Sequence, residues 1–172
     1  MTDTLRKGRV VGLSGNMVAV QFEDRVMQNE VAYVIREDQR LKSEVIRVKG
    51  DRADLQVFED TQGIKIGDPV EFTNELLSVE LGPGLLGHIF DGLQNALQEL
   101  AGLYGFFLKR GAYLKPLDEN KKWPFTPAVK KGNRVRSGEK LGTVPEKIFQ
   151  HWIMAPFHLS GEFEIARIAE EG

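Results

Sequence analysis

Short apolar runs separated by turn-forming residues fill the first part of this sequence and restrict what it can fold into. Between Val45 and Phe58, apolar side chains recur mainly at alternate positions, as they do in a strand with one face on a core and the other in water. Closely spaced strands of this kind favour a small antiparallel barrel, because closure leaves no unpaired sheet edge. The expected strands are 10–13, 17–22, 30–35, 44–48, 53–58 and 70–72.

Glycine-containing pairs mark the turns between these runs. Gly50-Asp51 stands between two strand-like runs, and glycine supplies the positive φ that a type II′ hairpin needs at its first central position. Gly15-Asn16 and Gly67-Asp68-Pro69 punctuate the sequence in the same way. The stretch 73–77 is typical of a short linker, so the barrel is expected to end near residue 75.

The segment 77–105 shows a helical spacing of apolar residues that its glycines contradict. Each interior glycine costs a helix about 1 kcal/mol and an interior proline about 3 kcal/mol, and four glycines and Pro83 fall between positions 82 and 92. We therefore expect a strand at 78–81, a tight turn through Gly87, a short strand near Ile89, and a helix over 95–104 with Asn95 as its N-cap.

From Lys122 onward the sequence again reads as short strands and turns, with Gly-Asn at 132–133 and Ser-Gly at 137–138. The predicted fold class is mainly β. It comprises an N-terminal six-stranded antiparallel β-barrel (1–75), a short α/β connecting segment (76–115) and a second β module (116–172). Because the final residues, GEFEIARIAEEG, read as a strand followed by a turn, we expect the second module to be truncated and the chain to be part of a longer protein.

Charge and composition exclude several classes of partner. The chain has 23 basic and 25 acidic residues and a net charge of -2, which gives no electrostatic reason to bind nucleic acid or an anionic membrane. It contains no cysteine, as is usual in a reducing compartment. The first residues lack the apolar stretch of a signal peptide, and the segment 92–108 carries too many polar residues to span a bilayer. We expect a cytoplasmic protein with no direct membrane insertion.

No motif for catalysis or metal binding is found. A phosphate-binding loop, G-x-x-x-x-G-K-[ST], is absent; in the nearest segment, 132–140, the glycines are one residue too far apart and Glu139 replaces the lysine. The serines lack the G-x-S-x-G frame. The pair Glu59-Asp60 is interpreted as a solvated loop. The three histidines, His88, His151 and His158, share no metal-ligand spacing.

Aromatic and basic residues of the second module are the candidates for partner contacts. Large aromatic side chains are enriched at interfaces, although packing within their own domain is more common. Lysines and arginines beside them could meet an acidic partner. The candidates are Trp123, Phe125, Phe149, Trp152, Lys130 and Lys131, with Arg134 and Arg136 nearby.

Three blocks of the sequence, VELGPGLLGHIFDGLQNAL, FFLKRG and KKWPFTP, closely resemble the catalytic A subunit of V/A-type rotary ATPases, in the same order. GRVVGLSGNMVAVQF resembles that family's opening barrel strands, and LQVFEDTQGIKIGDPVEFT resembles the stretch that closes the barrel. KKGNRVRSGEKLGTV occupies the place of an insertion that distinguishes the A subunit from its B partner, and its fold is expected to be hammerhead-like or lipoyl-like. Asn16, where the family often has proline, and Ser43-Glu44, where it often has Gly-Glu, are departures.

This resemblance implies a parent ATP synthase or ATPase that couples ATP synthesis or hydrolysis to rotation and ion transport, with ATP and Mg as cofactors. The family's phosphate-loop lysine and catalytic glutamate would lie beyond Gly172, so no catalytic, cofactor-binding or metal residue is assigned here and these residues alone are expected to be inactive. The implied partners are B subunits, alternating with A subunits in a hexameric head, and peripheral-stalk subunits. The implied location is the cytoplasmic face of the membrane, reached through the complex.

Two other functions stay open. The spacing G-x-x-V-x-x-G-x-x-L from Gly132 to Leu141 also resembles biotinyl or lipoyl carrier domains, in which a lysine at a hairpin tip is modified. Lys147 would be that lysine, but it lacks the flanking residues expected of an acceptor. The alternative to both is an adaptor or assembly scaffold, which for this segment alone is close to the family interpretation.

Overall fold

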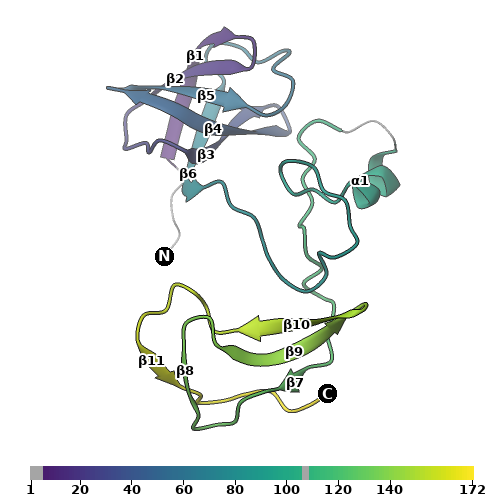
Figure 1. Cartoon of the computed structure of the whole chain (residues 1–172). Helices are drawn as coiled ribbons and strands as arrows, with labels where there is room; N and C mark the ends of the chain where they lie inside the picture. Colours follow the sequence, from purple (N-terminus) through teal and green to yellow (C-terminus); the bar gives the residue numbers. More distant parts are fainter. Residues whose placement is uncertain (1–5, 106–108) are drawn as a thin grey trace. The chain divides into compact units, whose positions relative to one another are not determined.

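The computed structural model describes residues 6–105 and 109–172 and divides the chain into two compact units. The first unit contains the residues up to Val79 together with Leu97–Leu114. The second contains Glu80–Ala96 and Lys115–Gly172. Figure 1 shows the barrel strands in the first unit and the shorter strands in the second.

The first unit is built on a closed antiparallel barrel with the strand order β1-β2-β5-β4-β3-β6. Pairing of β6 with β1 closes it, at Arg6↔Phe72 and Gly8↔Val70. The predicted six-stranded barrel is therefore confirmed. Its strands are β1 (Arg6–Ser14), β2 (Met17–Phe22), β3 (Glu30–Arg36), β4 (Gln39–Lys49), β5 (Arg52–Val57) and β6 (Pro69–Leu76).

Alternate residues of these strands fill the barrel, as the sequence pattern predicts. Gly8 is required where β1 passes between its two neighbours, because a Cβ there would lie 2.7 Å from Val20 Cγ1 and 2.9 Å from the carbonyl oxygen of Gln21. Phe22 and Phe72 meet edge to face, with ring centroids 5.9 Å apart. The buried core consists of Val10, Val18, Val20, Phe22, Ala32, Val34, Leu41, Val45, Ala53, Leu55, Val57, Ile64, Val70 and Phe72.

The hairpin between β4 and β5 has the predicted turn. Lys49 pairs with Arg52, which leaves Gly50 and Asp51 as the two central residues. Gly50 has φ 63°, whereas Asp51 is not among the residues with positive φ, and this combination fits type II′.

Residues 77–105 differ in part from the sequence expectation. β6 extends to Leu76 in place of a linker from Thr73, and the strand predicted at 78–81 is wrong, because these residues are irregular. An isolated bridge between Phe90 and Ala96 replaces the strand expected near Ile89. Helix α1 covers Leu97–Tyr104, two residues shorter than predicted at its start.

The second unit contains two small sheets. β9 (Lys140–Glu146) pairs with β10 (Phe149–Met154) on one edge and with the short β7 (Thr126–Pro127) on the other. β8 (Arg134–Arg136) pairs with β11 (Glu162–Glu164). Val135, Val144 and Ala155 are buried in this unit. The chain is thus mainly β in both units, as the sequence predicts.

Candidate functional site

The two aromatic residues of β10 point to opposite faces of its sheet. Phe149 pairs with Glu146 and Trp152 pairs with Thr143, and positions an odd number of residues apart on a strand face opposite ways. Their exposed fractions are 56% and 57%. Trp152 lies beside Lys140, whose Nζ is 4.9 Å from the ring centroid. Both side chains are accessible, but they do not form one continuous patch.

The other two aromatic candidates pack within their own unit. Trp123 is half-buried, and a Cβ placed on Gly84 would lie 3.5 Å from its ring. Lys121 Nζ lies 4.0 Å from the centroid of the same ring. Phe125 is also half-buried and fills the space over Gly142. Intramolecular packing therefore accounts for much of the surface of Trp123 and Phe125.

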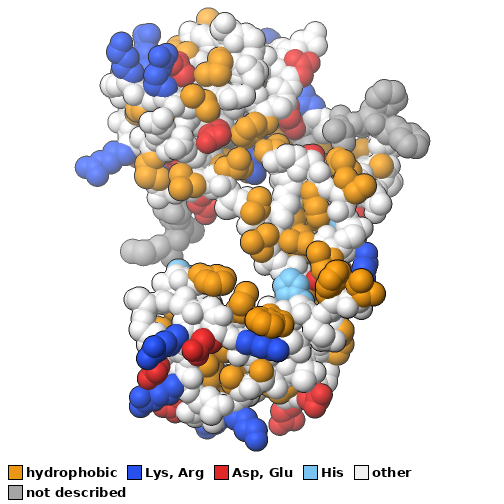
Figure 2. Space-filling view, in the orientation of Figure 1, with side chains coloured by type: hydrophobic (Ala, Val, Ile, Leu, Met, Phe, Trp, Pro, Cys, Tyr) orange, Lys and Arg blue, Asp and Glu red, His pale blue; other side chains and the backbone are white. Residues whose placement is uncertain are grey.

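Lys130 and Lys131 are exposed in the turn before β8. The turn is fixed by Asn133, whose Oδ1 accepts a 2.7 Å hydrogen bond from the Lys130 amide. The next two basic residues, Arg134 and Arg136, both pair with Glu162, at 3.1 and 3.7 Å. Basic and apolar side chains both reach the surface of this unit in Figure 2. Of these four basic candidates, the two lysines are the least engaged by carboxylates.

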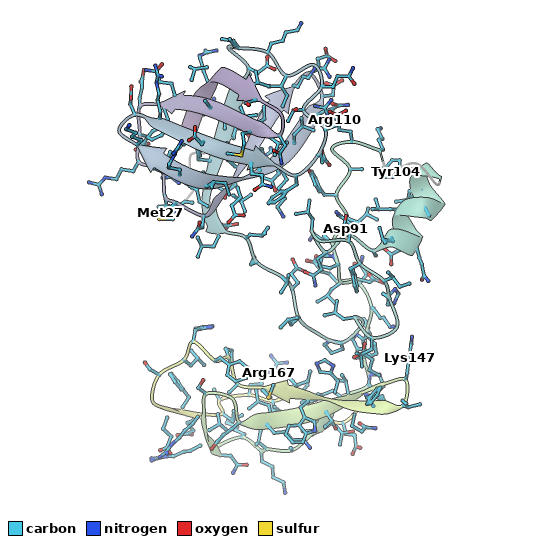
Figure 3. The ribbon with its side chains drawn as sticks, turned by 45° about the horizontal axis from the view of Figure 1, so that its top comes forward. Met27, Asp91, Tyr104, Arg110, Lys147 and Arg167 are labelled. Carbon is cyan, nitrogen blue, oxygen red and sulfur yellow. The ribbon has the colours of Figure 1, made fainter. Side chains whose placement is uncertain are left out.

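In the first unit, residues 110–113 return to the barrel and bind to it. Arg110, labelled in Figure 3, donates from Nη1 to the carbonyl oxygen of Gln62 at 2.7 Å. The Gly111 amide lies 3.1 Å from both oxygens of Glu59. The Lys42 amide donates to the Tyr113 hydroxyl at 2.8 Å. Glu59 is thus an anchor for the segment, whereas the sequence interpretation placed it in a solvated loop.

The Tyr113 hydroxyl is the most strongly perturbed group in this contact. Burial raises its pKa well above the ordinary value, the Lys42 amide lowers it in part, and the Glu59 carboxylate raises it again by its charge and by accepting a hydrogen bond. The ring also contacts Tyr33 edge to face, with centroids 6.4 Å apart. Tyr113 therefore stays protonated and serves as a donor and an acceptor in a structural contact.

The second unit holds a buried carboxylate that the sequence analysis did not single out. Glu146 is 2% exposed, and its Oε1 accepts hydrogen bonds from the amides of Gly84 at 2.7 Å and Leu86 at 3.0 Å. Its Oε2 lies 2.9 Å from Nδ1 of His151. Burial by itself raises the pKa of a carboxyl group, but the two amides and His151 outweigh it, so the pKa of Glu146 lies below its ordinary value.

Strand alternation was the signal that could have identified Glu146. In β9, Val144 is buried and Glu146 lies two residues further along, on the same face of the strand. A glutamate at an inward position needs partners, since an unpaired buried carboxylate is costly. Two of its three partners, however, lie about sixty residues earlier in the chain, in a loop that no local pattern connects with β9.

The described part of the chain shows neither a cluster of metal-ligating side chains nor a membrane-spanning helix. Across residues 6–105 and 109–172, the His, Asp and Glu side chains form no group of three suited to hold a metal ion. In the same residues, no helix has both the length and the apolar character that crossing a bilayer requires.

Comparison with known proteins assigns both β regions. Residues 10–74 match a family model described as the ATP synthase alpha/beta family β-barrel domain. Residues 114–172 match the ATP synthase alpha/beta subunit barrel-sandwich domain. The chain belongs to the ATP synthase alpha/beta family. The match to the β-barrel domain ends two residues before the end of β6, and the match to the barrel-sandwich domain includes β7 to β11.

Its relatives in the ATP synthase family include several V-type alpha chains. The V-type ATP synthase alpha chain of Treponema denticola is 56% identical over 98% of this chain. The V-type ATP synthase alpha chain 1 of Treponema pallidum is 53% identical over all of it, and the alpha chain of Borrelia garinii subsp. bavariensis is 50% identical over 96%. The chain spans 29% of the length of each of these relatives.

Proposed function

We propose that this chain is the N-terminal part of the catalytic A subunit of a V/A-type ATP synthase or ATPase, which couples ATP synthesis or hydrolysis to ion transport. The 56% identity with a V-type alpha chain over nearly the whole sequence carries this proposal. The sequence blocks around the glycine-rich loop, which resemble the A subunit in particular, support it.

In this function, residues 1–172 contribute structure and assembly, and ATP chemistry takes place elsewhere in the subunit. Neither the loop 82–87 nor the turns of the second module offer a lysine at the spacing that phosphate binding requires. ATP and Mg therefore bind to other parts of the parent subunit, and this segment alone is inactive.

The two β regions have different partners in the proposed assembly. The barrel, in residues 1–75, forms a ring with the corresponding barrels of alternating B subunits. The second module, in residues 116–172, contacts peripheral-stalk subunits, and residues 76–115 begin the nucleotide-binding domain. The complex holds this segment at the cytoplasmic face of the membrane. The exposed side chains of Phe149, Trp152, Lys130 and Lys131 are the proposed stalk contacts.

A carrier function for Lys147 is the less favoured alternative. Lys147 does lie at the tip of the β9–β10 hairpin, as a carrier lysine would (Figure 3). Its side chain, however, lies over Gly87, where even a Cβ would overlap with Nζ. Mass spectrometry of protein purified from cells tests this alternative, because biotinylation or lipoylation adds a fixed mass at Lys147.

Deletion of residues 116–172 from the full-length subunit tests the proposed role. Two quantities are measured separately: ATP hydrolysis by the assembled head, and binding of stalk subunits to it. We expect substantial hydrolysis and weakened stalk binding. Normal stalk binding by an assembled head without the module would contradict the proposal. Loss of hydrolysis with intact stalk binding would also contradict it and would show that the module is needed for catalysis instead.

A further inference from the structure

The buried Glu146 joins two segments that are far apart in the sequence. Through Oε1 it binds the loop 82–87, and through Oε2 it binds His151 of its own hairpin. All of these atoms belong to the second unit, which combines residues 80–96 with residues 115–172. We propose that Glu146 is a positioning residue that locks the loop 82–87 to the β9–β10 hairpin, so that the two segments move as one body.

The loop side of this joint has a backbone that exposes its amides to Glu146. Gly84 has φ 111° and Gly87 has φ 85°, backbone conformations that residues other than glycine rarely adopt. The amides of Gly84 and Leu86 converge on a single carboxylate oxygen, an arrangement in which each hydrogen bond is strengthened by the negative charge. The loop is thus shaped to hold one anionic group.

The module contacts the same loop with apolar side chains. A Cβ on Gly82 would lie 3.1 Å from Leu117 Cδ1, and one on Gly84 would lie 3.7 Å from Leu117 Cδ2. Trp123 lies on Gly84 as well, 3.5 Å from the position of such a Cβ. These contacts hold the loop against the module, while the carboxylate fixes its orientation, because hydrogen bonds are directional and apolar contacts are not.

The hairpin side is also held in an uncommon conformation. Lys147, next to Glu146, has φ 55°, in the left-handed region that a lysine seldom occupies. This turn directs the Lys147 side chain across Gly87 while Glu146 reaches Gly84 and Leu86. Two consecutive residues of the hairpin therefore contact the same loop, Glu146 at Gly84 and Leu86 and Lys147 at Gly87. Backbone strain of this kind persists where the surrounding contacts require it.

Burying a carboxylate is a costly way to stabilise a strand, so the role of Glu146 lies in its contacts with other segments. An apolar residue at its inward position would pack without the penalty of burying a charge. Most of the hydrogen bonding to Glu146 forms only when the loop is in place, since two of its three partners belong to the loop and the third is His151. Glu146 therefore selects one arrangement of loop and module. If the proposed function holds, displacement of the module by a stalk partner is transmitted through this joint to residues 80–96.

Amide exchange and relaxation of the 172-residue chain, followed by NMR, test the joint. Glu146→Leu removes both acceptor oxygens, and Glu164→Gln is the control, because Glu164 is an exposed residue of β11. In the parent chain the amides of Gly84 and Leu86 should exchange slowly. In Glu146→Leu their exchange should accelerate roughly tenfold or more, as expected when a charge-assisted hydrogen bond is lost. Relaxation should also show faster internal motion of the N–H bonds in the loop than of those in β9 and β10.

A second variant approaches the joint from the loop. Gly87→Ala strains a backbone with φ 85° and displaces the end of the Lys147 side chain, and it should release the same two amides while Glu146 is still present. Slow amide hydrogen exchange at the paired residues His151 and Val144 shows that the β9–β10 ladder is formed and that each variant is folded. Unchanged exchange at Gly84 and Leu86 in a folded Glu146→Leu chain would overturn the proposal. Because only this chain is used, that result would leave the stalk experiment independent.

Discussion

Glu146 and His151 lie diagonally across the β9–β10 hairpin and share a hydrogen bond of 2.9 Å between Oε2 and Nδ1. His151 pairs with Val144, two residues before Glu146 on the same strand face. The histidine is about one-third exposed, whereas the carboxylate is buried. The pair therefore connects a solvent-accessible ring with the interior of the second unit.

Acid should destabilise the second unit through Glu146. Its pKa is lowered in the folded state, so the stabilisation is complete above the unfolded-state pKa of about 4.3 and is lost as the pH falls through the folded-state value. Urea unfolding of the second unit, followed by the fluorescence of Trp123 and Trp152, measures this loss. Glu146→Gln should be less stable at neutral pH and should show a smaller change between pH 6 and pH 3. An unchanged acid dependence in Glu146→Gln would contradict this assignment.

The barrel should not tolerate a side chain at Gly8. Gly8→Ala places a Cβ 2.7 Å from Val20 Cγ1 and 2.9 Å from a backbone oxygen, and overpacking of this kind costs about 1–3 kcal/mol. Gly12→Ala is the matched control in the same strand, because its Cβ would make an ordinary contact of 3.6 Å with Ala19. Thermal unfolding should show a clear loss of stability only for Gly8→Ala. Equal effects of the two substitutions would mean that the close approach at Gly8 is absent.

Tyr113→Phe should loosen the segment 110–113 from the barrel. The substitution removes the acceptor of the Lys42 amide and the donor to Glu59, with an expected cost of about 1–3 kcal/mol for leaving buried groups unpaired. Tyr104→Phe, at an exposed position in α1, is the control. Limited proteolysis should cut Tyr113→Phe faster near residue 111 than either the parent chain or the control. Equal cleavage rates would show that the hydroxyl does not hold the segment.

The exposed and half-buried aromatic residues should respond differently to truncation. Trp152→Ala should leave the stability of the chain nearly unchanged, because the side chain is largely in water, whereas Trp123→Ala should destabilise the second unit by removing packing on the loop. In the full-length subunit, Trp152→Ala should weaken stalk binding by about thirtyfold if it is a central contact, since losing such an anchor costs at least about 2 kcal/mol. Undiminished binding would remove Trp152 from the proposed interface.

The strands and tight hairpins of the barrel could be predicted from sequence because their signals are local. Alternating residues such as Val18 and Val20 mark a buried face, and the Gly50-Asp51 turn fixes the register of β4 and β5. A strand was predicted at residues 78–81 because the following glycines and Pro83 argue against a long helix, but in the structure these residues lie outside any sheet and are exposed. Pairing partners, and not the propensity of the segment, decide whether a strand forms there.

Contacts between distant segments were the part that the sequence could not supply. Glu59 reads as a loop carboxylate until Gly111 is brought to it, and Trp123 reads as an exposed anchor until the loop containing Gly84 covers it. The opposed directions of Phe149 and Trp152 did follow from the period of two in a strand, once β10 was known to include both. The sequence thus names candidate residues, but it does not show which of them pack within their own unit or whether the exposed ones form one surface.

The central claim, that these residues serve assembly while ATP binds elsewhere in the subunit, is tested most directly by calorimetry of the 172-residue chain with Mg-ATP. The account predicts no saturable heat, because no lysine-bearing phosphate loop is found in the sequence. A stoichiometric isotherm with micromolar affinity would contradict it and would place a nucleotide site within this chain.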